Sequence, residues 1–153
     1  MTGVKSLRLA QRIRQLKPSP TIAVMGEAMR LKAEGVDVVD FSAGQPDFPT
    51  PEHIKLSGEK AIADNFTRYT ANPGMPELRQ AVADRYREDY GLEFESSNVI
   101  ITSGGKHALL NLMLTLVEPG DEVVIPTPYW GTFAEQVRLA GGEPVFELSN
   151  SRP

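Results

Sequence analysis

The chain has 153 residues, 41% of them hydrophobic and 24% charged, and a formal net charge of −4, values typical of a globular domain with a core of its own. The negative charge argues against general nucleic-acid binding, which depends on Lys and Arg neutralising phosphates. The chain has no cysteine and only two histidines, which excludes a disulfide framework and a zinc cluster, so we expect no metal site.

No apolar run reaches the roughly 18 residues of a membrane span, so we expect no membrane association. Residues 1–20 are basic and contain no acid, which also fits a transit peptide. This stretch lacks the serine enrichment of such peptides, and its lead into Pro18-Ser19-Pro20 is typical of a structured arm. We therefore expect a cytoplasmic protein, with organellar targeting as the alternative.

In chain order, the first elements alternate helix, strand and loop. Residues 21–34 have helical spacing and end at Gly35, and residues 36–41 have the pattern of a strand. A loop rich in Gly and Pro follows. We expect Thr50 to cap a helix over 51–65, and a helix over 77–90 to end at Gly91.

The second half alternates strand and helix regularly. Strands are predicted at 98–102, 122–126 and 144–148, with helices over 106–117 and 132–140 between them. The first of these helices is apolar nearly all round, which predicts deep burial. This order predicts an α/β fold whose parallel strands are covered by helices on both faces. Ligands bind outside the carboxyl ends of such strands. We expect the chain to be truncated, because no helix follows the last strand.

Two loops at strand ends carry groups suited to a ligand. Ser103-Gly104-Gly105-Lys106 opens a helix, where backbone N–H groups and the helix dipole favour an anion, although a plain turn capped by Ser103 fits equally. The turn lacks the glycine spacing of a Walker or dinucleotide motif. Trp130, the only tryptophan, could stack on a planar ring or pack in a core. Gly44 could present its N–H to a ligand or simply allow a turn, and Tyr69 could be a packing residue.

Taken together, these motifs resemble the class I/II aminotransferases, which are fold type I enzymes dependent on pyridoxal 5'-phosphate (PLP). The similarity covers essentially the whole chain and follows the family's order of motifs: Gly-x-Pro-Asp-Phe-x-Thr-Pro, Tyr-Thr-x-x-x-Gly-x-x-x-Leu-Arg, Gly-Gly-Lys and Pro-Tyr-Trp. The bacterial aspartate (aspartate/prephenate) branch is the nearest match. The resemblance implies an N-terminal arm and first helix on the small-domain side over 1–35. It implies the first part of the large PLP-transferase-like domain over 36–153.

The resemblance assigns cofactor-binding roles. Gly105 and Lys106 match positions whose backbone N–H groups hold the PLP phosphate. Trp130 matches the aromatic residue that stacks on the pyridine ring. Tyr69 matches a tyrosine that reaches the phosphate of the partner subunit's PLP, which implies a homodimer when the enzyme is full length.

It also assigns substrate-binding roles. Gly44 matches the glycine that contacts the substrate α-carboxylate, and Trp130 also touches substrate. Lys106 and Thr21 match residues that help bind the distal carboxylate of an acidic substrate, since a cation pairs with a carboxylate. Lys17 matches an arm residue that bears on prephenate use. The implied reaction moves an amino group between L-aspartate, or a similar acidic amino acid, and 2-oxoglutarate.

No residue of the chain matches the lysine that forms the family's Schiff base, so we expect no catalytic residue here and an inactive chain on its own. The asparagine, aspartate and arginine that accompany this lysine in the family's active site are likewise expected beyond Pro153. Two alternatives stay open. One is another class I enzyme, such as an aromatic or alanine aminotransferase. The other is a non-catalytic remnant that binds a phosphate ligand or a full-length subunit.

Overall fold

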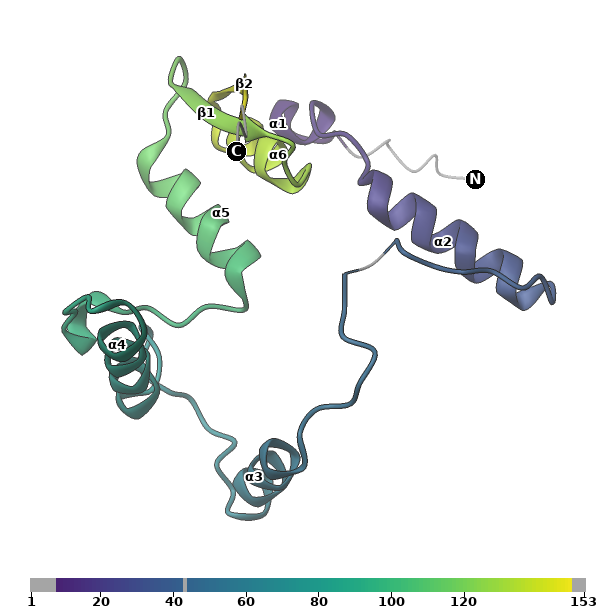
Figure 1. Cartoon of the computed structure of the whole chain (residues 1–153). Helices are drawn as coiled ribbons and strands as arrows, with labels where there is room; N and C mark the ends of the chain where they lie inside the picture. Colours follow the sequence, from purple (N-terminus) through teal and green to yellow (C-terminus); the bar gives the residue numbers. More distant parts are fainter. Residues whose placement is uncertain (1–7, 43, 150–153) are drawn as a thin grey trace, which may run out of the picture. The chain divides into compact units, whose positions relative to one another are not determined.

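The computed structural model describes residues 8–42 and 44–149, which combine helices with a small sheet (Figure 1). The chain divides into two compact units. Unit 1 comprises Met1–Ala43 and Leu109–Pro153, and unit 2 comprises Gly44–Ala108. We take each unit by itself. The mixture of helices with parallel strands agrees with the predicted α/β class.

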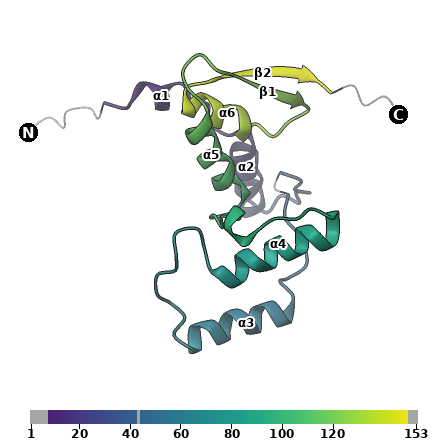
Figure 2. The same ribbon diagram turned by 90° about the vertical axis from the view of Figure 1, so that its left-hand side faces the viewer.

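A pair of parallel strands with a crossover helix forms the centre of unit 1. Strand β1 (Glu122–Thr127) pairs with β2 (Glu143–Leu148), and helix α6 (Thr132–Ala140) connects them. Figures 1 and 2 both show the strands side by side with α6 next to them. Parallel neighbours need such a crossover connection, and these three elements confirm the predicted strand–helix–strand order.

The core of unit 1 lies between the sheet and α6. Ile125, Ala134 and Val137 are buried together, and Val137 is fully enclosed. Met113, Val123 and Phe133 pack around them. Unit 1 thereby has a compact apolar centre directly behind the loop that leaves β1.

Two helices of unit 1 precede this core in the chain. Helix α1 (Gln11–Arg14) contacts α6, and α2 (Pro20–Ala33) follows a short arm. The Ser19 side chain accepts from the N–H of Ile22, and Pro20 is the first residue of the helix, where its missing N–H costs nothing. The helix predicted over 21–34 is confirmed.

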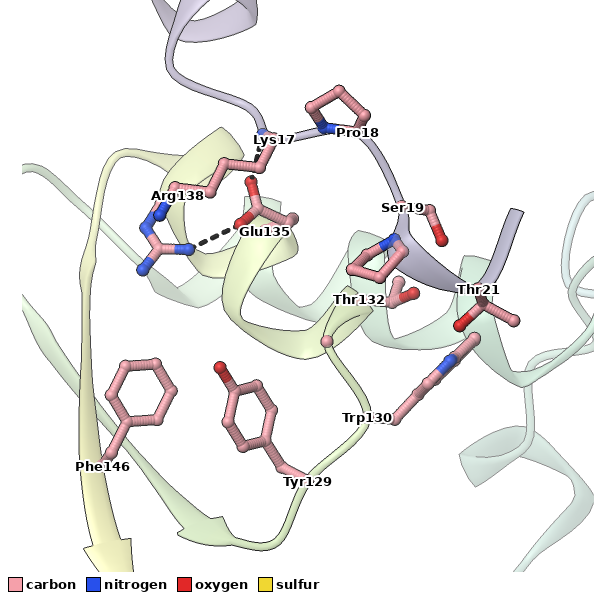
Figure 3. A pocket seen from close by; sticks show the side chains of 12 residues that line it. Lys17, Pro18, Ser19, Thr21, Tyr129, Trp130, Thr132, Glu135, Arg138 and Phe146 are labelled. Carbon is pink, nitrogen blue, oxygen red and sulfur yellow. Dashed lines mark hydrogen bonds and ion pairs between the residues drawn. The ribbon is translucent and has the colours of Figure 1, made fainter. Parts of the chain in front are cut away.

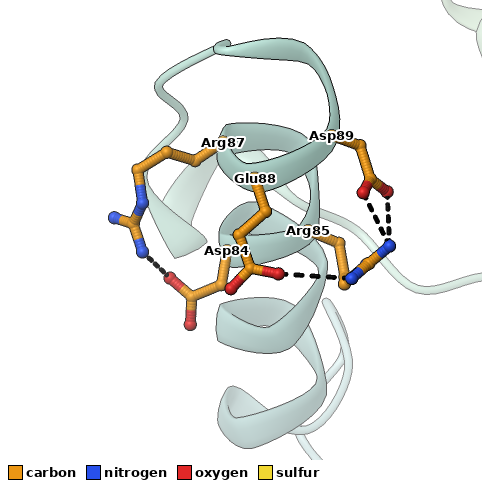
Figure 4. A network of polar contacts seen from close by, with 5 residues as sticks. All are labelled: Asp84, Arg85, Arg87, Glu88 and Asp89. Carbon is orange, nitrogen blue, oxygen red and sulfur yellow. Dashed lines mark hydrogen bonds and ion pairs between the residues drawn. The ribbon is translucent and has the colours of Figure 1, made fainter.

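Unit 2 contains helices α3 (Glu52–Ala63) and α4 (Pro76–Tyr90) and the 3-10 turn η1 (Ser96–Asn98). Gly91 ends α4 with a φ of 67°, as predicted. The predicted cap Thr50 is wrong, because Pro51 occupies the cap position and α3 starts one residue later than expected. On α4, Arg87 pairs with Asp84, and Arg85 with Glu88 and Asp89 (Figure 4). These side chains are exposed, so the pairs contribute little to stability.

Two predicted strands are absent from the described residues. Residues 36–41 and 98–102 are irregular, and the sheet has two strands, not three or more. Residues 98–102 are held by isolated bonds, such as the Ile101 N–H to the Pro73 carbonyl and the Arg79 side chain to the Val99 carbonyl. A strand needs a continuous ladder with a neighbour, and neither segment forms one with another described segment.

The predicted burial is also wrong in part. Helix α5 (Gly105–Leu116) contains no buried residue, and Leu112, Leu114 and Leu116 are exposed. Nor is the sheet covered on both faces: Ile125 is buried under α6, whereas Val124 on the other face is 61% exposed. Met113 of α5 packs against the core of unit 1, whereas the three exposed leucines do not belong to that cluster. Within residues 8–42 and 44–149, no helix has the length and apolar character needed to cross a membrane.

Candidate functional site

A cleft of about 690 Å³ opens in unit 1 at the carboxyl end of β1 (Figure 3). One wall is the N-terminal arm, defined here as the segment from Lys17 to Thr21. The opposite wall is the loop after β1 together with the first turns of α6. In open α/β sheets, ligands bind outside the carboxyl ends of the strands, which is where this cleft lies.

Three of the predicted site residues line this cleft. Lys17 and Thr21 come from the arm, and Trp130 comes from the loop after β1. Thr21 and Trp130 lie at the same end of the cleft in Figure 3. The arm and the loop are more than 100 residues apart in sequence, so the fold itself brings these side chains to one place.

Trp130 is half exposed and is held by an aromatic contact. Its ring meets Phe133 edge-on, with centroids 5.5 Å apart and an interplanar angle of 88°. Phe133 itself packs against the core of unit 1. The indole is therefore held against the core while the residue as a whole stays 44% exposed. This is an arrangement suited to stacking against a planar ligand.

The sequence analysis gave no role to several other residues of the cleft, among them Tyr129, Glu135 and Arg138. Tyr129 stacks on Phe146 of β2, with centroids 4.9 Å apart and an angle of 26°. Arg138 donates to Glu135 Oε1 at 2.6 Å, and the spacing of three residues on a helix was a usable signal for this pair.

The same carboxylate ties the arm to α6. The backbone N–H of Lys17 donates to Glu135 Oε2 at 3.0 Å. Each oxygen of Glu135 thus accepts from one donor, one on the arm and one on its own helix (Figure 3). Both side chains of the Glu135–Arg138 pair are only about a quarter exposed, at 24% and 27%.

The glycine turn of unit 2 lies open to solvent. Gly104 has a φ of +81°, which favours glycine, and α5 begins at Gly105. The helix dipole and the outward N–H groups at the start of a helix favour an anion here. An added Cβ at Gly104 or Gly105 would meet no heavy atom within 4 Å. The backbone of this turn is therefore open to the approach of a ligand.

The capping of this turn differs from the simplest expectation. Ser103 is not the cap of α5; its backbone N–H instead donates to Nδ1 of His107 at 3.2 Å. Thr102 Oγ1 donates to the Gly104 carbonyl at 2.9 Å. These two hydrogen bonds stabilise the turn through the side chains of Thr102 and His107. The turn therefore has its open conformation without a ligand.

The remaining predicted residues, Gly44, Tyr69 and Lys106, also belong to unit 2. All three are exposed. In the described part of unit 2, the Tyr69 ring makes no hydrogen bond or ring contact, and the whole residue is accessible. The structure thus unites the unit 1 residues in a cleft and presents those of unit 2 on open surface. Among residues 8–42 and 44–149, no cluster of side chains is suited to a metal.

The fold and the cleft define an α/β protein with an aromatic, partly charged site beside the end of a parallel strand. The family described as aminotransferase class I and II matches residues 36–151. The chain therefore belongs to the class I and II aminotransferase family, which confirms the resemblance carried by the sequence motifs.

Individual proteins of the family are similar over most of the chain. A probable aspartate/prephenate aminotransferase of Thermus aquaticus is 49% identical over 137 residues, covering 90% of this chain and 36% of that protein. An aspartate/prephenate aminotransferase of Nitrosomonas europaea is 46% identical, covering 92% of this chain and 35% of its own length. The structure of Thermus thermophilus aspartate aminotransferase with maleate matches with a TM-score of 0.88 and 44% identity, over 92% of this chain and 37% of that one. The chain thus spans about a third of the length of these relatives.

Proposed function

We propose that this chain supplies cofactor-binding and substrate-binding residues of a PLP-dependent aminotransferase. The enzyme moves an amino group between L-aspartate, or a similar acidic amino acid, and 2-oxoglutarate. One observation carries the proposal: the cleft that unites Lys17, Thr21 and Trp130. The names of the similar proteins, and the dicarboxylate maleate bound to one of them, support an acidic substrate.

The residues of the glycine turn and the cleft are assigned to the cofactor. The backbone N–H groups of Gly105 and Lys106 hold its phosphate, and Trp130 lies against its ring. The exposed ring of Tyr69 fits a role on the phosphate of a partner subunit's cofactor, in a homodimer. When bound, PLP acts as the electron sink of the reaction. This chain's residues bind it and orient it.

Substrate recognition is assigned to two residues of the arm and to two exposed residues of unit 2. Thr21 and Lys106 bind the distal carboxylate, where a cation and a hydroxyl complement negative charge. Gly44 presents its backbone to the α-carboxylate, and Lys17 adds positive charge at the arm. Residues 1–35 belong to the small-domain side and 36–153 to the large domain of a cytoplasmic enzyme.

The phosphate assignment is tested by Gly105→Ala in the complete gene product. Alanine favours the helix and meets no atom within 4 Å, so the fold should be unchanged or slightly more stable. A phosphate seated on the turn would instead meet the new methyl group, so the affinity for PLP should fall about tenfold or more. Affinity is measured from the absorbance of bound PLP, and stability from thermal unfolding.

Two comparisons make this test specific. Gly58→Ala lies in the interior of α3 and also meets no atom within 4 Å, so it should leave PLP affinity unchanged. Pyridoxal, which lacks the phosphate, should bind the Gly105→Ala variant and the parent alike. Equal PLP affinity in variant and parent would refute the phosphate site.

The substrate class is decided by a panel of amino donors with 2-oxoglutarate as acceptor. Aspartate should give a kcat/KM at least tenfold above those of alanine and phenylalanine, because only aspartate offers a second carboxylate to Lys106 and Thr21. A preference for alanine or phenylalanine would favour the other class I enzymes. Absence of transamination with every donor would favour a non-catalytic binding role.

A further inference from the structure

The arm is joined to the rest of unit 1 by a polar contact that does not involve an arm side chain. Glu135 Oε2 accepts from the backbone N–H of Lys17 at 3.0 Å, across 118 positions of sequence. Since the donor is a backbone group, the contact fixes the path of the chain and leaves the Lys17 side chain available to the cleft. Thr21 follows four residues later in the same wall of the cleft.

Arg138 orients the carboxylate of Glu135 by a hydrogen bond. It donates to Oε1 at 2.6 Å, which leaves Oε2 directed to Lys17. The side chains of Glu135 and Arg138 are 24% and 27% exposed, so solvent screens them less than it would a fully exposed pair. Charge-assisted hydrogen bonds of this kind are shorter and stronger than neutral ones.

A second contact holds the chain to α6 at a point before Lys17. We call the bond from the Lys17 N–H to Glu135 the tether. Helix α1 packs against α6, so the chain is held to α6 both before Lys17 and at Lys17. Beyond this point the arm runs along the cleft to Ser19, which caps α2. Glu135 is therefore the attachment that precedes the residues facing Trp130.

We propose that Glu135 is a positioning residue for substrate recognition. Through the Lys17 N–H it holds the arm along the cleft and thereby sets where Lys17 and Thr21 stand relative to Trp130. Arg138 assists by holding the carboxylate in the orientation that meets the arm. This inference rests on the proposed function for its effect on substrate, but the tether itself can be measured without any activity.

The tether is tested in the complete gene product by hydrogen exchange at the Lys17 amide. Glu135→Ala removes the acceptor, and Glu135→Gln keeps the size but has one oxygen for two donors. Both variants should exchange this amide about tenfold faster than the parent. Glu135→Asp, which keeps the charge with a shorter reach, should lie between. Glu122→Gln removes an exposed carboxylate on β1 and should change nothing.

The effect on recognition is tested by kinetics with the same variants. Glu135→Gln should raise KM for aspartate roughly threefold to tenfold while kcat changes less than twofold, because the arm is displaced but the reacting groups are not. Glu122→Gln should change neither constant. Thermal unfolding of each variant separates this effect from loss of fold.

The outcomes distinguish the two proposals. Unchanged exchange at the Lys17 amide in Glu135→Ala would overturn the tether. Faster exchange with an unchanged KM would overturn its role in recognition. Faster exchange in the Glu135 variants, combined with a parent protein that transaminates no donor, would leave the tether established and refute the aminotransferase proposal alone.

Discussion

At the scale of single residues, Asp40 has the most strongly perturbed electrostatic environment described. The hydroxyl and the backbone N–H of Ser42 both donate to its Oδ1, at 2.6 and 3.0 Å, and Lys32 donates to Oδ2 at 3.2 Å. The hydrogen bonds from Ser42, followed by that from Lys32, lower the pKa of Asp40 from 3.8 to about 2. The group is a carboxylate that stabilises the turn before Gly44.

This environment predicts a local dependence on pH. Because the folded-state pKa is lowered, the contribution of Asp40 to stability is complete above the unfolded pKa of 3.8 and is lost as pH falls towards about 2. An NMR titration of the carboxyl carbon should give a midpoint near 2 for Asp40. Ser42→Ala removes the hydroxyl donor and should raise the pKa of Asp40 towards its usual value. A midpoint near 3.8 in the parent would contradict the turn geometry.

The candidate site could be predicted from sequence only residue by residue. Gly105, Lys106 and Trp130 stand in recognisable local motifs, which is why sequence alone could nominate them. The contact of Lys17 with Glu135 joins positions 118 apart, and no local pattern encodes it. Tyr129 was missed because its partner Phe146 lies on another element.

At the scale of elements, the helices were predicted well and the strands less so. Helix ends carry local signals, such as the Ser19 cap and Gly91 in the left-handed conformation. A strand exists only when a neighbour completes its ladder, and residues 36–41 and 98–102 have no such neighbour in the described chain. β1 and β2 were predicted correctly because each lies beside the other through a short crossover.

A pair of glycines offers a test of this local packing. Gly74 has a φ of +103°, and an added Cβ would lie 2.6 Å from the side chain of Ile101. We expect Gly74→Ala to destabilise the protein by about 1–3 kcal/mol through strain and overpacking. Gly58→Ala, in the open interior of α3, should instead stabilise it by about 0.5–1 kcal/mol. Denaturant unfolding of both variants measures the difference, and equal effects would contradict the packing of Ile101.

At the scale of the whole molecule, the chain matches part of its relatives and exposes apolar surface. It spans about a third of the length of its relatives, and the apolar faces of α5 and of the sheet at Val124 are uncovered within the described residues. Large exposed apolar surfaces promote association. The predicted parallel sheet is confirmed in part, since one parallel strand pair is present among the described residues.

The predicted inactivity of these 153 residues is testable on the isolated polypeptide. We expect none of its lysines to take the family's cofactor-linked position, and we expect Lys106 on the phosphate side. Incubation with PLP, reduction with borohydride and peptide mapping should give no single stoichiometric lysine adduct. One adduct at a unique lysine would show that a residue within this chain takes the catalytic role.

The half-exposed indole of Trp130, in the loop after β1, has a practical consequence for ligand-binding measurements on this polypeptide. Trp130 is the sole tryptophan of the sequence, and it lines the cleft. Intrinsic fluorescence of this polypeptide, excited selectively at the indole, therefore originates from one location. A spectral change on adding a small molecule would report arrival at that location, with no label attached and no background from elsewhere in the chain.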